Sequence, residues 1–226
     1  MNRMIRVGHR GAAGHEPENT LSSLQYAIGL GLDIAEFDIR RTQDGVLVLL
    51  HDETVDRTTN GKGPVDHFSF RDLKALDAGH GNPIPSLEEA LRLADGRIGM
   101  VLELKIPGIA QECVEVVQRL RLHSPVIYAS FLLEELSDIR DADQQASTMA
   151  LFSDLPSDPL GIVATVRPSH ATHVGLRHDT VTSDLIQALH QAGWPVFAYT
   201  VNEPAAIERL KAYGIDGIIS DFPDRL

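Results

Sequence analysis

The chain alternates short apolar runs with stretches in which apolar residues recur at a helical spacing. The short runs have the length and composition of buried β-strands. They are Ile5–Gly8, Asp33–Ile39, Ile98–Lys105, Pro125–Ser130, Ser147–Phe152, Ala171–Leu176, Pro195–Val201 and Ile215–Ser220. Strands that alternate with helices in this way predict parallel β-α-β units.

Several of the intervening stretches carry helix start and stop signals. Ser86 with Glu89 three residues on forms a capping box, and Gly96 ends the same stretch. The other predicted helices are 21–32, 110–122, 183–193 and 202–214. The pattern therefore predicts an α/β protein with the (β/α)8 TIM barrel fold, for which 226 residues is near the lower limit. A doubly wound open sheet is the competing fold, but no G-x-G-x-x-G motif follows the first strand.

One segment departs from the alternation, after the second predicted strand. Asp44-Gly45 is typical of a tight turn, so Val46–Leu50 should return as the second arm of a hairpin. The following residues 52–83 are rich in polar residues and glycine, with a weak helical signal at Asp72–Leu76. We expect one domain over residues 1–226, with residues 52–83 as a small cap insertion over one end of the barrel.

Composition narrows the classes of partner. The chain has 20 Lys and Arg against 32 Asp and Glu, a formal net charge of −12, which argues against nucleic-acid binding and against docking on an anionic membrane. It has no run of 18 apolar residues, so we expect no membrane insertion. The N-terminus lacks the apolar core of a signal peptide and Cys113 is the one cysteine, which together favour a cytoplasmic location. The oligomeric state stays open, with a homodimer among the options.

Two predicted strands carry acidic residues on one face. Side chains alternate along a strand, so Glu36 and Asp38 share a face, and so do Glu103 and Lys105. At the carboxyl ends of barrel strands these carboxylates should project inward, where such barrels keep their active sites. Clustered carboxylates stay ionised when a cation compensates them, and oxygen ligands favour Mg²⁺ or Ca²⁺. The alternative is that Glu36 pairs with Arg40, and Glu103 with Lys105, as ordinary rim residues.

Other polar residues at strand ends are candidates for the same site. His9 ends the first strand and His51 ends the hairpin arm, and imidazole is a natural general acid or base near neutral pH. Arg10 offers a planar fork for a phosphate, and Lys105 offers a point charge. Tyr199, at the end of the seventh strand, could line the pocket. Each also has an ordinary interpretation as a surface ion pair or a packing residue.

Taken in order, these motifs resemble the glycerophosphodiester phosphodiesterase family over nearly the whole chain. The most specific are His9-Arg10-Gly11 followed by Pro17-Glu18-Asn19-Thr20, then Glu36-x-Asp38, Thr42-x-Asp44-Gly45 and His51-Asp52. Weaker matches are Asp56-Arg57-Thr58-Thr59-Asn60-Gly61, Pro85-Ser86-Leu87-Glu88-Glu89, Glu103-Leu104-Lys105, Ser130-Phe131, Thr200-Val201-Asn202 and Asp216–Asp221.

The resemblance implies a barrel with a small cap that hydrolyses glycerophosphodiesters, its small-molecule substrates, to an alcohol and glycerol 3-phosphate. It implies one divalent cation, Mg²⁺ or Ca²⁺, held by Glu36, Asp38 and Glu103. It further implies His9 and His51 as the acid–base pair, and Arg10 and Lys105 as phosphate contacts. Tyr199 stands where the family often has Trp, so the wall that faces the substrate should differ. Two alternatives are a lysophospholipase D-like activity on lipid substrates and a barrel that binds phosphate without catalysis.

Overall fold

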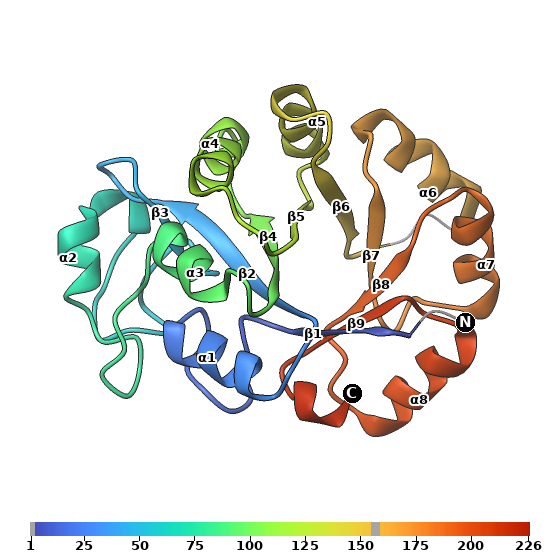
Figure 1. Cartoon of the computed structure of the whole chain (residues 1–226), viewed down its shortest axis with the longest axis horizontal. Helices are drawn as coiled ribbons and strands as arrows, with labels where there is room; N and C mark the ends of the chain where they lie inside the picture. The colour runs from blue at the N-terminus through green and yellow to red at the C-terminus, as the bar shows by residue number, and fades with distance from the viewer. Residues whose placement is uncertain (1–2, 155–158) are drawn as a thin grey trace.

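The computed structural model describes residues 3–154 and 159–226, and its strands form a ring enclosed by helices (Figure 1). The parallel strands are β1 (Ile5–Gly8), β2 (Ile34–Arg41), β4 (Gly99–Leu104), β5 (Val126–Ser130), β6 (Ser147–Phe152), β7 (His173–Arg177), β8 (Val196–Tyr199) and β9 (Gly217–Ser220). They pair in the order β1-β9-β8-β7-β6-β5-β4-β2, and β1 also pairs with β2, which closes the sheet. The predicted (β/α)8 barrel is therefore confirmed, and the open-sheet alternative is wrong.

The hairpin arm is the exception to the parallel order. Strand β3 (Leu47–Leu49) runs antiparallel to β2, with Leu49 opposite Ile39, as the Asp-Gly turn predicts. The segment that follows contains the 3₁₀ helix η1 (Val65–His67) and α2 (Phe70–Lys74), at the left of Figure 1. Helix α2 begins two residues before the predicted signal because the Ser69 hydroxyl caps its first turn.

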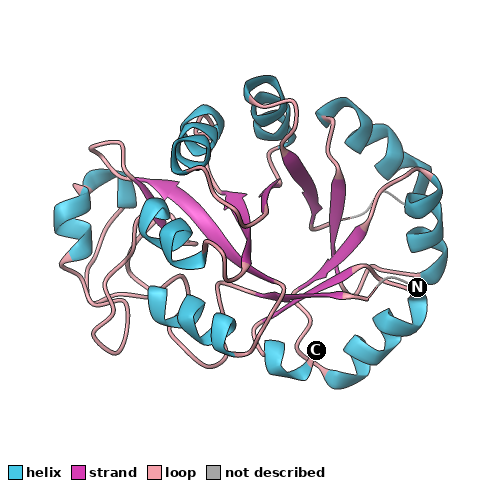
Figure 2. Cartoon of the chain, viewed as in Figure 1, coloured by secondary structure: helices cyan, strands magenta, loops and turns pink. Residues whose placement is uncertain are grey.

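The helices pack around the outside of the ring, as Figure 2 shows. They are α1 (Leu21–Gly29), α3 (Leu87–Ala94), α4 (Ala110–Leu120), α5 (Leu133–Ala142), α6 (Pro159–Val166), α7 (Ser183–Gln191) and α8 (Pro204–Tyr213), with short 3₁₀ helices η2 (Arg167–Ser169) and η3 (Pro223–Arg225). The predicted capping box of Ser86 and Glu89 is present at α3. Helices α5 and α6 lie outside the predicted set, because α6 has no polar face and α5 buries a glutamate beside its apolar stripe. None of the helices in the described residues is both long and apolar enough to cross a membrane.

The outward and inward faces of the barrel strands contribute to two separate apolar clusters. Outward side chains such as Phe37 and Leu102 pack under the helices and are fully buried. The inward side chains of the lower barrel form a separate apolar cluster that includes Val101, Met149 and Phe197. This cluster fills the interior, so the polar inward residues are confined to the carboxyl ends of the strands.

A buried carboxylate joins two neighbouring helices. Glu135, in the first turn of α5, is 3% exposed and accepts hydrogen bonds from the backbone N–H groups of Gly108 (2.6 Å), Ile109 (3.2 Å) and Ala110 (3.1 Å). These groups are the otherwise unpartnered donors at the start of α4. Glu135 therefore acts as a cap supplied by another helix, which no local sequence pattern predicts.

We expect Glu135→Ala to lower the free energy of unfolding by about 2–3 kcal/mol, because buried N–H groups would lose a charged acceptor. For a chain of this length that corresponds to a fall in Tm of roughly 4–12 °C, measurable by calorimetry. Glu134→Ala is the matched control, since the neighbouring Glu134 is exposed. Equal melting temperatures for the two variants would show that Glu135 does not stabilise the start of α4.

Candidate active site

Three carboxylates meet at the upper rim of the barrel. Glu36 and Asp38 project from β2 and Glu103 from β4, and the strand register places Asp38 opposite Glu103. Their side-chain oxygens lie within 4.8 Å of one another. Glu36 and Asp38 are 3% and 1% exposed, so water screens their charges little.

Two oxygens of this cluster have no hydrogen-bond partner among the described residues. Glu36 Oε1 and Asp38 Oδ1 are buried, and neither finds a hydrogen bond among the described residues. Burial, followed by the charge of Asp38, raises the pKa of Glu36 and of Glu103 above the ordinary range. Buried acceptors without donors and carboxyl groups that resist ionisation are both features of a site that fits a cation. The all-oxygen donor set fits Mg²⁺ or Ca²⁺.

The ion-pair alternative is right for one pair and wrong for the other. Lys105 Nζ donates to Glu103 Oε1 at 2.6 Å and lies 3.6 Å from Asp38 Oδ1. Glu36, however, accepts a hydrogen bond from the backbone N–H of Arg10 at 2.9 Å rather than pairing with Arg40. The cluster is thus bordered by cations without being neutralised by them.

His9 stands beside the cluster at the end of β1. Its Nδ1 lies 2.6 Å from Asp221 Oδ1, and its Nε2 lies 3.9 Å from Glu36 Oε2. An ionised carboxylate only accepts hydrogen bonds, so Nδ1 carries a proton and Nε2 is the atom left to exchange one. Burial lowers the pKa of His9, but Asp221 and Glu36 outweigh it and leave that pKa above its ordinary value.

His51 contacts a carboxylate through Nδ1 in the same way as His9, but its pKa is shifted in the opposite direction. Its Nδ1 lies 2.7 Å from Asp52 Oδ1, which again leaves Nε2 free to exchange a proton. Burial outweighs the charge of Asp38 and the hydrogen bond to Asp52, so the pKa of His51 lies below its ordinary value. The pKa values of the two imidazoles are therefore shifted in opposite directions.

Asp52, the partner of His51, is held by Arg57, which is not one of the predicted site residues. Arg57 donates from Nε to Asp52 Oδ2 (2.7 Å) and from Nη2 to Asp52 Oδ1 (3.0 Å), which keeps the pKa of Asp52 well below its usual range. The same guanidinium donates twice to Glu18, at 2.8 Å each, and Glu18 accepts a further bond from Arg10 at 2.7 Å. This chain of charges ties the segment after β3 to the loop after β1. Both Glu18 and Arg57 occur in the family motifs, but their spacing alone does not show that they meet.

Asn19 is a second supporting residue, and its partner cannot be predicted from the local sequence. Thr20, not Asn19, is the N-cap of α1. Asn19 takes a left-handed conformation (φ 57°), donates Nδ2 to Asp38 Oδ2 at 2.9 Å and accepts the Asp38 N–H at 3.1 Å. It thereby fixes the Asp38 carboxylate.

The predicted residues line one small pocket. A cavity of 180 Å³ is bounded by His9, Arg10, Glu36, His51, Glu103, Lys105 and Tyr199, with apolar side chains below. Asp38 borders it through its contacts with Arg10 Nε (3.2 Å) and Lys105. Tyr199 donates its hydroxyl to the Phe152 carbonyl at 2.7 Å, so the ring is the part that can face a ligand. Phe131 packs edge-on against that ring, with centroids 5.9 Å apart.

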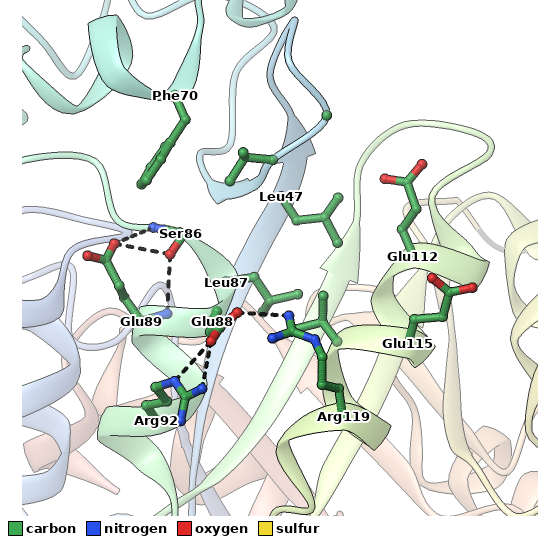
Figure 3. A pocket seen from close by; sticks show the side chains of 13 residues that line it. Leu47, Phe70, Ser86, Leu87, Glu88, Glu89, Arg92, Glu112, Glu115 and Arg119 are labelled. Atoms are coloured by element: carbon green, nitrogen blue, oxygen red, sulfur yellow. Dashed lines mark hydrogen bonds and ion pairs between the residues drawn. The ribbon is translucent and has the colours of Figure 1, made fainter.

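A larger hollow of 610 Å³ lies on the outside of the barrel, between the β2–β3 turn, α3 and α4 (Figure 3). Three of its charged residues, Glu88, Arg92 and Arg119, are paired with one another. Glu88 accepts hydrogen bonds from Arg92 and Arg119, as the dashed lines in Figure 3 show. None of the described residues that line it is a histidine, which leaves the rim pocket as the better candidate for acid–base chemistry.

Comparisons with known proteins find relatives that match nearly the whole chain. The chain is 32% identical to a glycerophosphodiester phosphodiesterase of Caldanaerobacter subterraneus (99% of this chain, 96% of that protein) and 31% identical to one of Bacillus altitudinis (96% and 94%). Among solved structures, an Oleispira antarctica phosphodiesterase in complex with the product sn-glycerol-3-phosphate superposes with a TM-score of 0.90 at 27% identity (99% and 94%). A glycerophosphodiester phosphodiesterase of Agrobacterium tumefaciens superposes with a TM-score of 0.86 at 31% identity, over 99% of this chain and 98% of that one.

These similarities confirm the family resemblance that the sequence motifs indicate. They also confirm the prediction that the protein is an enzyme of the glycerophosphodiester phosphodiesterase class. The family model for glycerophosphoryl diester phosphodiesterases matches residues 9–225, from the first candidate histidine almost to the C-terminus. The chain belongs to the glycerophosphoryl diester phosphodiesterase family.

Proposed function

We propose that the protein hydrolyses glycerophosphodiesters to an alcohol and glycerol 3-phosphate, with one divalent cation and two histidines. The observation that carries this proposal is the buried cluster of Glu36, Asp38 and Glu103, with unpartnered oxygens, beside two imidazoles in one pocket. Relatives over the full length bear the name of this activity, and the Oleispira antarctica structure holds glycerol 3-phosphate as product.

Each candidate residue then has a chemical task. Glu36, Asp38 and Glu103 would hold Mg²⁺ or Ca²⁺, which when bound supplies positive charge for the oxygens on phosphorus. Arg10 and Lys105 stand at the edge of the cluster and would contact the phosphate. The remaining steps belong to the histidines.

His51 is the first base in this proposal and His9 the first acid, since the pKa of His51 is lowered and that of His9 raised. The neighbouring glycerol hydroxyl forms a bond to phosphorus and gives its proton to His51 Nε2. The bond from phosphorus to the alcohol oxygen breaks, and His9 Nε2 gives that oxygen a proton. Water then opens the cyclic phosphate with the proton transfers reversed.

A lysophospholipase D-like activity is the second candidate. Phe131, which lines the pocket, and the next residue Leu132 follow β5, and each is 40% exposed, which would suit an apolar leaving group. The negative net charge weighs against work at an anionic surface. Binding without catalysis is less favoured, because both imidazoles are held through Nδ1 and neither Nε2 has a hydrogen-bond partner among the described residues.

Product analysis on a panel of substrates tests the proposal. We expect glycerophosphocholine to yield choline and glycerol 3-phosphate in Mg²⁺ or Ca²⁺, and EDTA to stop the reaction until the cation is restored. Lysophosphatidylcholine should turn over more slowly. Faster turnover of the lysolipid would favour the second candidate, and no turnover of either would favour a binding protein.

Two further expectations, on cellular location and on domain organisation, are part of the same proposal. A cytoplasmic site of action suits a substrate released from lipids inside the cell and a single, buried cysteine. Within a single domain over residues 1–226, residues 52–83 would act as a cap beside the pocket, since Asp52 and Arg57 of this segment support His51 and Glu18.

A further inference from the structure

Arg40 is a buried arginine that the proposed chemistry does not use. It follows Glu36 and Asp38 on the same face of β2 and is 9% exposed. Its Nε donates to the His51 carbonyl oxygen at 2.9 Å. Among residues 3–154 and 159–226, the guanidinium makes no other hydrogen bond and no ion pair.

The surroundings leave this cation poorly compensated. Its Nη1 and Nη2 have no partner among the described residues and are not among the fully buried polar atoms, so they are open to a ligand that enters beside them. Arginine's fork matches a carboxylate in particular.

Arg40 also borders a second hollow next to the catalytic pocket. This hollow of 410 Å³ is lined by Arg40, Glu53, Asp66 and Ile106, among others. Ile106 follows Lys105, and Glu53 lies two residues after His51, so both come from segments that line the catalytic pocket. Two residues along a strand span roughly 6.5 Å, which is the offset of Arg40 from Asp38. A substituent on the phosphate could therefore extend past His51 to the guanidinium.

The acidic residues of the hollow favour a ligand that also carries a positive charge. Glu53 and Asp66 are exposed, and within the described part of the chain neither carboxylate has a hydrogen-bonded or ion-paired partner. Arg41 and His67 also line the hollow, but Arg41 is paired with Glu112. Among the described residues, Arg40 therefore offers an unpaired positive charge in the wall, and Glu53 and Asp66 offer negative charges at the rim. That arrangement is complementary to a group with a carboxylate and an ammonium on one carbon.

We propose that this hollow is the subsite for the alcohol part of the substrate and that Arg40 selects an amino-acid head group, as in glycerophosphoserine. The inference rests on the proposed phosphodiesterase function and adds its substrate class. Glycerophosphoethanolamine is the matched comparison, because it lacks only the carboxylate. Arg40 is a specificity residue here and takes no part in the proton transfers.

The test compares kcat/KM for these two substrates in wild type, in Arg40→Gln, and in Arg92→Gln as a control on the outer surface. We expect wild type to prefer glycerophosphoserine. Arg40→Gln, whose amide can still donate to the His51 carbonyl, should reduce that preference by roughly 10- to 100-fold, the worth of a charge-assisted hydrogen bond. Arg92→Gln should leave the preference unchanged. Competitive inhibition by O-phosphoserine against phosphoethanolamine should show the same dependence on Arg40 without turnover.

The outcomes separate the two proposals. An equal loss on both substrates would make Arg40 a support for the His51 loop and overturn the subsite. An unchanged preference in Arg40→Gln would overturn it as well. If wild type with Mg²⁺ or Ca²⁺ cleaves neither substrate, the proposed function itself fails, and inhibitor binding can no longer be read as substrate choice.

Discussion

Replacing His51 with alanine should lower kcat by roughly 10²–10⁴-fold and leave the fold intact, because one proton transfer loses its side chain. The fold should survive because Asp52, the partner of His51, keeps both hydrogen bonds from Arg57. The side chain of His51 is 34% exposed and lines a cavity rather than the core. Steady-state kinetics on glycerophosphocholine, with circular dichroism and Tm as checks on folding, measure the effect.

His123→Ala is the matched control. His123 also contacts a carboxylate, Asp95, but its side chain is 86% exposed and lies outside the pocket. It should keep wild-type turnover. A His51→Ala enzyme that retains wild-type kcat would remove His51 from the mechanism.

The pH profile of wild type supplies an independent check on the same residue. The base must be neutral to accept a proton, so activity should fall as pH drops through the pKa of His51. Burial places that pKa below the ordinary value of 6.5, so the acid limb of the profile should lie below 6.5. The acid limb should change in His51→Ala and be unaffected in His123→Ala.

The sequence predicts the framework of this molecule well for a definite physical reason. Inward and outward residues alternate along each barrel strand, and this period of two is visible in the chain itself. It places Glu36, Asp38 and Glu103 on inward faces at strand ends, where the structure brings their oxygens together. The Asp44-Gly45 turn likewise predicts the reversal into β3.

The supporting contacts depend on distances that no local pattern encodes. Asp221 reaches His9 from the far end of the chain, and Arg57 reaches Glu18 from the segment after β3. Glu135 caps a helix other than its own. Asn19 is of a residue type that often caps helices, but its backbone is left-handed and its side chain hydrogen-bonds to Asp38 instead. In each case closure of the barrel creates the contact, so the sequence shows the residue without its partner.

Glu36→Gln should abolish the response of the protein to divalent cations, both in binding and in turnover. The variant keeps the size of the side chain and an oxygen that can accept the Arg10 N–H, but it removes one of three charges from the cluster. Groups that only orient a metal ligand already change metal affinity by roughly 10- to 100-fold, so loss of a ligand charge should cost more. We expect kcat/KM to fall at least as far.

Thermal unfolding separates this effect from a general loss of activity. A cation at about 100 times its Kd stabilises the folded state by about 2.7 kcal/mol, or roughly 5–11 °C in Tm for a chain of this length. Wild type in EDTA should therefore gain several degrees when Mg²⁺ or Ca²⁺ is added, and Glu36→Gln should gain almost none. Glu88→Gln, in the outer hollow, removes a carboxylate away from the cluster and should behave as wild type. If Glu36→Gln keeps full activity and the full rise in Tm, the cation does not bind at this cluster, and the chemistry proposed for the pocket cannot depend on it.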